Sequence, residues 1–427
     1  MDNNNEVQEN ENKVVIEEQA VKPEKPKKKG RLTWSGVLLG ILIGILLMFI
    51  PTVIICLVNI LSISSLNARL SNIDSTIVTQ DVATKLDNLD AILNAYYYED
   101  VDKEAEKDAL YYGIMESVGD PYTCYYNEEE IAQLYEDLAG KFEGIGAYIH
   151  KDIDADYCTI QSLIPNSPAA ESELEPDDII IKVDGTDTYG MTLNEVVSMI
   201  RGDEGTSVVL TIKRGDEEKE ITIVRAKVET ISATYESLDN GIGLITITEF
   251  NDNTYEFFKE AKQQFIDNGD TALILDLRGN PGGNLDTVVN IAQEILPQGL
   301  VVYTEDKYGK REEYKCDGKK EMNVPIVVLV DGSSASASEI LAGAIKDHNK
   351  GTLIGTTTFG KGIVQKLISL SDGTAVKITV SKYYTPNGVN IHGTGIEPDI
   401  EVEFDADAYT ENGTDNQMEA AIEYLTK

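Results

Sequence analysis

The chain has 427 residues, of which 42% are hydrophobic, so it is long enough for two or three domains with packed cores. Its 36 basic and 74 acidic residues give a formal net charge of −38. An acidic surface of this kind favours solubility and repels phosphate backbones, which excludes nucleic acid as a partner.

Four cysteines are present, and their positions argue against a metal site. Cys56 lies in an apolar run, whereas Cys124, Cys158 and Cys316 show neither a CxxC spacing nor a nearby histidine. An odd number outside the apolar run also disfavours a disulfide framework, which leaves room for one bridge at most. We therefore expect neither a metal ion nor another cofactor.

The N-terminal part is expected to anchor the chain in a membrane. Residues 1–35 form a polar tail with basic residues from Lys22 to Arg31, and residues 36–61 are uncharged over more than the roughly 20 residues that span a bilayer. Basic residues stay on the cytoplasmic side, so we predict a disordered cytoplasmic tail and an extracytoplasmic chain after residue 61.

The alternative for this apolar run is a cleaved signal peptide, whose apolar region has about 7–15 residues and ends in small residues. The run in this chain is longer, and no A-x-A pattern follows it. An uncleaved signal anchor over residues 36–61 is therefore favoured, which makes the chain a single-pass protein of the cell membrane.

Residues 62–140 are predicted to form a helical N-terminal region. Leu86, Leu89, Ile92 and Leu93 recur at helical spacing. Such a stripe is most often ordinary core, and its alternative is a self-association face for a homodimer.

The pattern then changes twice. Residues 141–228 contain short β-rich runs separated by Gly and Asp turns, with one helical stretch at 193–200, which indicates a compact α+β module. Residues 229–400 alternate apolar strands with helices, which indicates an α/β core. A C-terminal segment, residues 401–427, ends in a short helix.

The first candidate for chemistry is a strand-turn-helix in the α/β core. A buried strand ends at Asp331, small residues fill the turn, and a helix is predicted to begin near Ser336. Free N–H groups at a helix N-terminus stabilise the negative charge that a serine nucleophile creates on its substrate. The alternative is that these serines cap the helix or pack, which we expect for Ser333, Ser334 and Ser338.

A serine nucleophile needs a base, and histidine is the usual choice. Of the three histidines, His150 belongs to the α+β module and His348 follows the helix after Ser336. His392, in a late glycine-rich loop, is the only plausible histidine.

That scarcity directs attention to Lys361, which lies between Gly360 and Gly362. A lysine acts as a base only when uncharged, and burial lowers its pKa by up to about 3–5 units. Gln365 follows four residues later and, if this segment is helical, shares a face with Lys361 and could orient the amine by a hydrogen bond. The alternatives are a solvated turn or a phosphate clamp, and the absence of GxxxxGK[ST] excludes a P-loop.

A second glycine-rich turn, DLRGNPGGNL at residues 276–285, follows another strand. Its N–H groups could complete an oxyanion hole with that of Ala337. The alternative is an ordinary tight turn, held by Asp276 and Arg278.

Together these residues resemble the carboxyl-terminal processing (tail-specific) proteases. The matching segments, which occur in the family's order, are DPYTCYY, FEGIGAYI, IPNSPAA, IIIKVDG, IRGDEGTSVVLTIKR, DLRGNPGG, SSASASEILAGAIKD, TFGKGIVQ, KYYTPNG and GIEPDI. The resemblance implies a crotonase- or ClpP-like ββα core. It makes Ser336 the nucleophile, Lys361 the general base and Gln365 its orienting partner, and the backbone of Ala337, Gly282 and Gly283 the oxyanion hole.

The α+β module then resembles a PDZ domain, which adds a peptide's C-terminal strand to a sheet edge. Residues Glu143, Gly144, Ile145 and Gly146 match its carboxylate-binding loop, and Arg201 could sense the peptide or form a surface ion pair. The segment 175–178 departs from the family, which has a glycine before the aspartate, so this loop could differ.

The expected function is a membrane-anchored serine endopeptidase that cuts extracytoplasmic proteins at or near exposed C-terminal tails, recruited or gated by its PDZ domain. A catalytically inactive scaffold that holds partners at the membrane is the main alternative. An acyl-CoA enzyme of the crotonase type shares only the core fold, and the anchor opposes it.

Overall fold

The computed structural model describes residues 77–152 and 155–427, and the chain divides after Val101 into two compact units. The apolar run 36–61, predicted to be the membrane anchor, lies outside the described residues. Within the residues that are described, none of the helices combines the length and the apolar character needed to span a bilayer.

In the first unit the described residues form helix α2 (Gln80–Tyr96). The apolar stripe predicted for this segment is present, but Leu89, Ile92 and Leu93 are exposed within the unit. The stripe is therefore not packed as core inside this unit.

The second unit opens with α3 (Lys103–Glu116), β1 (Cys124–Tyr126) and α4 (Glu128–Ala139). A capping box of Asn127 and Glu130 begins α4, and Gly140 ends it with a φ of 63°. The region predicted to be helical, residues 62–140, also contains the strand β1, whose three residues pair with strand β18 far along the chain.

The α+β module contains one helix and eight strands of the second unit. In chain order the elements are β2 (Lys141–Gly144), β3 (Ala147–His150), β4 (Cys158–Leu163), β5 (Ile179–Val183), β6 (Thr186–Asp187), α5 (Leu193–Ile200), β7 (Ser207–Arg214), β8 (Glu217–Val224) and β9 (Ala226–Glu229). The main sheet has the order β3-β4-β5-β7-β8, so β3 is an edge strand. Strands β2 and β9 form a separate pair.

The α/β core is built on a six-stranded sheet of order β10-β11-β12-β15-β16-β19. Its elements are β10 (Ala233–Ser237), β11 (Ile242–Ile247), α6 (Thr254–Asn268), β12 (Ala272–Asp276), α7 (Leu285–Ile295), β15 (Ile326–Val330), α8 (Ala337–Asp347), β16 (Thr352–Gly355) and β19 (Ile400–Glu401). All neighbouring pairs except β10–β11 are parallel, as continuous apolar strands between helices predict.

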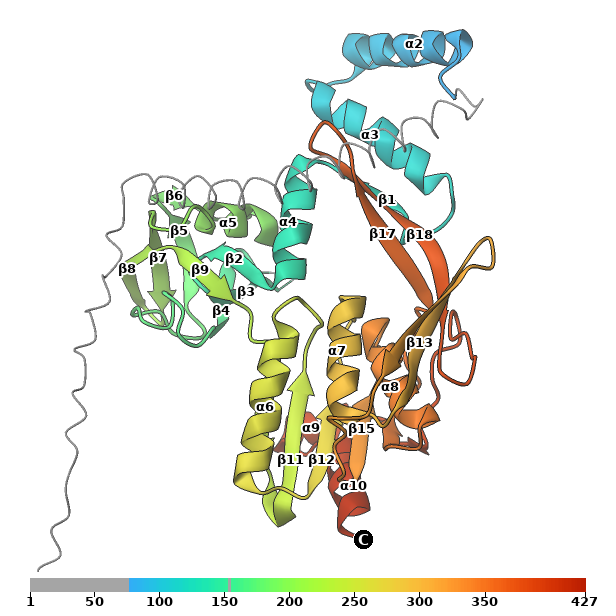
Figure 1. Cartoon of the computed structure of the whole chain (residues 1–427). Helices are drawn as coiled ribbons and strands as arrows, with labels where there is room; N and C mark the ends of the chain where they lie inside the picture. The colour runs from blue at the N-terminus through green and yellow to red at the C-terminus, as the bar shows by residue number, and fades with distance from the viewer. Residues whose placement is uncertain (1–76, 153–154) are drawn as a thin grey trace, which may run out of the picture. The chain divides into compact units, whose positions relative to one another are not determined.

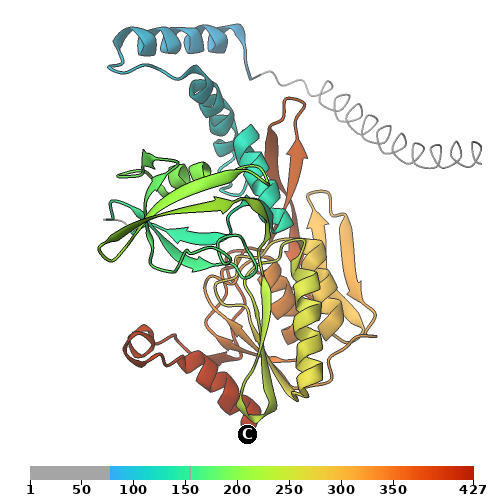
Figure 2. The ribbon, with the colours of Figure 1, turned by 90° about the vertical axis from the view of Figure 1, so that its left-hand side faces the viewer.

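Alternate residues of each core strand face opposite layers. Leu273 and Leu275 pack with the apolar residues of α6, α7 and α8, whereas Ile274 packs against α10 (Asn416–Thr426), which follows α9 (Ala406–Asn412). Figure 2 shows α6, in yellow, and α10, in red, on opposite sides of the sheet. The predicted likeness to the crotonase and ClpP architecture stays a prediction.

A second sheet completes the core. It contains β13 (Gly299–Asp306), β14 (Arg311–Cys316), β17 (Ile363–Ser369) and β18 (Ala375–Tyr384), together with β1. Strands β17 and β18 form a long antiparallel hairpin that extends beyond α7 and α8 (Figure 1). Because Lys361 lies two residues before the start of β17, this hairpin helps to fix the position of the predicted base.

Candidate active site

Ser336 lies where strand β15 turns into helix α8. Its φ of 53° and ψ of −110° are values that residues other than glycine rarely adopt. Two hydrogen bonds join this turn to the segment after β12. The N–H of Ala335 donates to the carbonyl of Asn280, and Ser334 Oγ donates to the carbonyl of Leu277. A strained strand-turn-helix of this kind presents the serine hydroxyl beside the free N–H groups of the helix.

The serines around Ser336 fix this turn by contacts other than helix capping. Ser334 contacts Asp331 and Leu277 rather than the first turn of α8, so the expectation that it caps the helix is wrong. Ser338 Oγ donates to the carbonyl of Asn280 at 3.0 Å, so it holds the glycine-rich turn against α8 in addition to packing.

Glu339, one turn into α8, was not singled out in the sequence, and it organises the site. Its side chain is completely buried. Its two carboxylate oxygens accept hydrogen bonds from four donors, which are the N–H groups of Ser336, Gly360 and Lys361 and the hydroxyl of Thr358. This one carboxylate therefore fixes the nucleophile's backbone relative to that of the predicted base.

Ser336 and Lys361 line one cavity of about 360 Å³. The other residues that line it are Leu134, Leu138, Gly283, Asn284, Leu285, Ile340, Ile363, Val364, Gln365, Leu367, Lys377 and Tyr383. Most of these side chains are apolar, and they come from α4, α7, α8, β17 and β18. Lys361 Nζ and Ser336 Oγ, both in the described part of the chain, form no hydrogen bond with each other although both residues line this cavity.

The environment of Lys361 favours its uncharged form. Burial lowers the pKa of its amine, and the positive charge of Lys377 lowers it further, whereas Glu339 and Asp120 act in the opposite direction. The amine lies 4.8 Å from the centre of the Tyr122 ring. A lysine of lowered pKa in an apolar cavity beside a serine is suited to accept a proton.

Gln365 lines the same cavity, but on a different element from the one predicted. The helical face proposed for it and Lys361 is wrong, because Gln365 belongs to strand β17, where the pairing with β18 shifts between Val364 and Gln365. Its Nε2 is buried and lacks a hydrogen-bond partner among the described residues. This unpaired donor is available to a group inside the cavity.

The two glycines of the predicted oxyanion hole differ in what their N–H groups do. The N–H of Gly282 donates to Asn280 Oδ1 at 2.8 Å, so it is already engaged. Gly283 lines the cavity with Ser336, and Ala337 is the first residue of α8. Arg278 holds Asp276 and also reaches Asp415, as expected of a turn-holding pair.

Replacing Gly283 with alanine should impair cleavage strongly. A Cβ at this position would lie 2.2 Å from the carbonyl oxygen of Phe250, so the turn must move. Displacement of the Gly283 N–H, the predicted oxyanion donor, should cost about 10²–10³-fold in kcat. Gly279→Ala in the same turn is the matched control, because its Cβ would meet nothing within 4 Å despite a φ of 70°. Peptide-cleavage rates of the two variants check this expectation, and equal rates would contradict it.

None of the three histidines, all of them described, lines the cavity of Ser336. His348 ends α8, with its Nε2 2.7 Å from the carbonyl of Leu300. His150 belongs to β3, and His392 is exposed. The geometry therefore favours Lys361 over His392 as the partner of Ser336.

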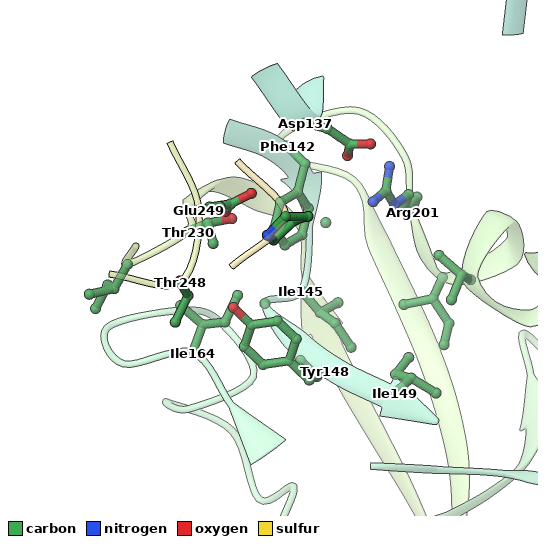
Figure 3. Close-up of a pocket in the computed structure, with 17 residues that line it drawn as sticks. Asp137, Phe142, Ile145, Tyr148, Ile149, Ile164, Arg201, Thr230, Thr248 and Glu249 are labelled. Carbon is green, nitrogen blue, oxygen red and sulfur yellow. The ribbon is translucent and has the colours of Figure 1, made fainter. Parts of the chain in front are cut away.

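A second cavity, of about 600 Å³, lies along the edge strand β3 of the α+β module (Figure 3). Three of the four predicted loop residues line it: Gly144, Ile145 and Gly146. Its other wall includes Val197 and Ile200 of α5, and the α/β core contributes Glu249 and Pro281. Pro281 directly precedes Gly282, so this groove reaches the glycine-rich turn of the candidate active site.

The two charged residues predicted for this groove have different positions. Arg201 lines it, where it pairs with Glu136 at 2.7 Å, donates to Gln133 and lies 5.2 Å from the centre of the Phe142 ring. Glu143 is not among the residues that line the groove, and its carboxylate accepts from the N–H of Glu204, so its role in peptide binding stays a prediction.

The loop that lacks the family's glycine keeps a left-handed turn. Asp177 takes a φ of 70°, an uncommon value that aspartate tolerates better than most residues. Buried Asp178 is held by Arg214 at 2.6 Å. That this loop differs from the family's loop stays a prediction. No cluster of three or more His, Cys, Asp or Glu suited to a metal ion occurs among the described residues.

Two family models match the chain, that of peptidase family S41 over residues 241–402 and that of the PDZ domain over residues 159–214. A probable CtpA-like serine protease of Staphylococcus haemolyticus is 40% identical over 73% of this chain, which spans only 62% of that relative's length. A probable CtpA-like serine protease of Staphylococcus aureus is 35% identical over 86% of this chain and 72% of its own length. The structure of a putative S41 protease from Bacteroides fragilis matches with a TM-score of 0.51 and 18% identity, over 79% of this chain and 96% of that one, which shows a shared fold.

Proposed function

Because the chain belongs to the serine peptidases of family S41, we propose that it cuts proteins near their C-terminal tails, with Ser336 as nucleophile and Lys361 as general base. The observation that carries this proposal is the single cavity that both side chains line. The lowered pKa of the Lys361 amine supports it as well, because a general base must be unprotonated.

The chemistry follows from this pair. Ser336 Oγ attacks the substrate carbonyl carbon while its proton passes to Lys361 Nζ, and the N–H groups of Ala337 and Gly283 stabilise the oxyanion. The C–N bond then breaks, and the ammonium of Lys361 gives its proton to the leaving amine. Water attacks the resulting ester and gives a proton to Lys361 Nζ. The ester C–O bond then breaks, and the ammonium of Lys361 returns this proton to Ser336 Oγ, which releases the acid and restores both groups.

Gln365 is proposed to orient the amine of Lys361. Both residues line the catalytic cavity, and the buried Nε2 of Gln365 lacks a partner among the described residues. A fixed amide beside a flexible lysine limits the rotamers that the amine can sample, which favours attack geometry.

The PDZ domain is proposed to bind the substrate's tail, which either recruits the substrate or gates the site. The groove along β3 offers an unpaired strand edge, the loop Gly144–Gly146 and the apolar side chains of Val197 and Ile200. A peptide can add to such an edge as a further strand, with its carboxylate on loop N–H groups.

Location and assembly are proposed from the sequence. The uncharged residues 36–61 behind a basic tail support a signal anchor with the catalytic part outside the cytoplasm. The exposed apolar residues of α2 support a homodimer through the N-terminal helices.

The test is to incubate the full-length chain, purified in detergent, with an unfolded protein and to identify the products by mass spectrometry. We expect cuts near the C-terminus with the wild-type chain and none with Ser336→Ala. Amidation of the substrate's C-terminus should lower kcat/KM, because the PDZ groove loses its carboxylate ligand. An intact substrate with the wild-type chain would instead indicate a catalytically inactive scaffold.

A further inference from the structure

A second lysine, Lys377, lines the catalytic cavity, and the proposed chemistry leaves it without a role. It lies on β18, where it pairs with Cys124 of β1 on one side and with Leu367 of β17 on the other. Its backbone is therefore fixed by strands on both sides.

The ammonium of Lys377 is held by an uncharged phenol and not by a carboxylate. It donates to the hydroxyl of Tyr126 and lies 5.0 Å from the centre of that ring. Burial raises the pKa of Tyr126, which keeps the phenol uncharged. Among the described residues no carboxylate pairs with Lys377, although the chain carries 74 acidic residues.

The charges that face Lys361 come from several elements. Glu339 of α8 and Asp120, in the loop before β1, favour its ammonium form, the Tyr122 ring lies 4.8 Å from the amine, and Tyr383, whose pKa is raised by burial, lines the cavity. The Glu339 carboxylate is required at this position, because it accepts hydrogen bonds from the N–H groups of both Ser336 and Lys361. The positive charge of Lys377 opposes these two carboxylates and adds to the effect of burial, which is the largest cause of the lowered pKa of Lys361.

We propose that Lys377 is a positioning residue that acts through Lys361, an inference that rests on the proposed function. Its fixed positive charge opposes the charges of Glu339 and Asp120 and so favours the unprotonated amine of Lys361. A neighbouring cationic group is one of the known ways to activate a lysine. The effect is electrostatic, so it requires the charge of Lys377 and not its particular shape.

The test is the pH profile of kcat/KM for an internally quenched peptide with the full chain in detergent. Activity rises with pH as Lys361 loses its proton, so Lys377→Gln should move this acid limb upward by about one pH unit. The loss relative to the wild type should shrink as the pH rises, because Lys361 then loses its proton in both proteins. Lys377→Arg, which keeps the charge, should leave the limb in place.

The matched control is Lys382→Gln, an exposed lysine on the same strand outside the cavity, which should leave the profile unchanged. If Lys377→Gln melts early by circular dichroism, Lys377→Met keeps the aliphatic stem and should show the same shift. An unmoved acid limb, or an equal loss at every pH, would overturn the proposal for Lys377.

Two variants distinguish an error in the role of Lys377 from an error in the role of Lys361. If Lys361→Ala is inactive and Lys377→Gln has the wild-type profile, only the role of Lys377 is lost. If Lys361→Ala cleaves as well as the wild type, the general base is wrong and the role of Lys377 falls with it.

Discussion

Ser336→Ala is expected to lower kcat/KM for peptide cleavage by about 10³- to 10⁶-fold, because it removes the hydroxyl that we propose as the nucleophile. The fold should survive, since the N–H of Ser336, which donates to Glu339 at 2.9 Å, is retained in alanine. Cleavage is measured with a quenched peptide, and folding by the thermal melt.

A matched variant, Ser336→Gly, separates catalysis from backbone strain. Ser336 has a φ of 53°, which glycine adopts without a steric penalty, so this variant should melt above Ser336→Ala while being equally inactive. Substantial cleavage by either variant would show that another residue is the nucleophile.

Glu339→Gln is expected to damage both stability and cleavage. Glutamine replaces one carboxylate oxygen with an amino group, which faces donors such as the N–H of Lys361 or of Gly360 and cannot accept from them. Each buried donor left without a partner costs about 1–3 kcal/mol. Because this contact positions Ser336 relative to Lys361, kcat/KM should fall by about 10²-fold or more.

The control for Glu339→Gln is Glu256→Gln, in the first turn of α6. Glu256 forms an exposed ion pair with Lys259, and exposed pairs of this kind contribute little to stability. Denaturant unfolding and peptide cleavage measure the two variants in parallel. If Glu339→Gln matched the control in both measurements, the carboxylate would not organise the site.

The parts of the site that depend on local signals could be predicted from the sequence. The strand, the small-residue turn and the helix around Ser336 are encoded within one short segment, and α8 begins at Ala337, next to the predicted start. Lys361 between two glycines was likewise recognisable. The structure places the side chains of Ser336 and Lys361 in one cavity.

Contacts between distant segments explain what the sequence did not reveal. Gln365 lies on a strand because residues 363–369 pair with β18, and tertiary pairing of this kind overrides a helical spacing. Ser336 and Glu339 do form a capping-box pattern in the sequence. The bonds from Glu339 to Gly360 and Lys361 arise only once the loop after β16 folds back onto α8.

The glycine-rich turn and the groove also depend on contacts between residues that their local sequence patterns do not reveal. Which glycine offers a free N–H depends on the side chain of Asn280, which accepts from Gly282. The groove wall formed by Pro281 and Glu249 depends on how the PDZ domain meets the core within the second unit. A tail bound in this groove would therefore contact the turn that carries Gly283.

The most direct measurement of the central claim compares peptide cleavage by Lys361→Ala and His392→Ala at the same pH. If uncharged Lys361 takes the proton of Ser336, Lys361→Ala should lose cleavage. His392→Ala should cleave at near wild-type rates, since His392 is exposed and lies outside the cavity. Full activity of Lys361→Ala together with an inactive His392→Ala would contradict the account and assign the base to histidine.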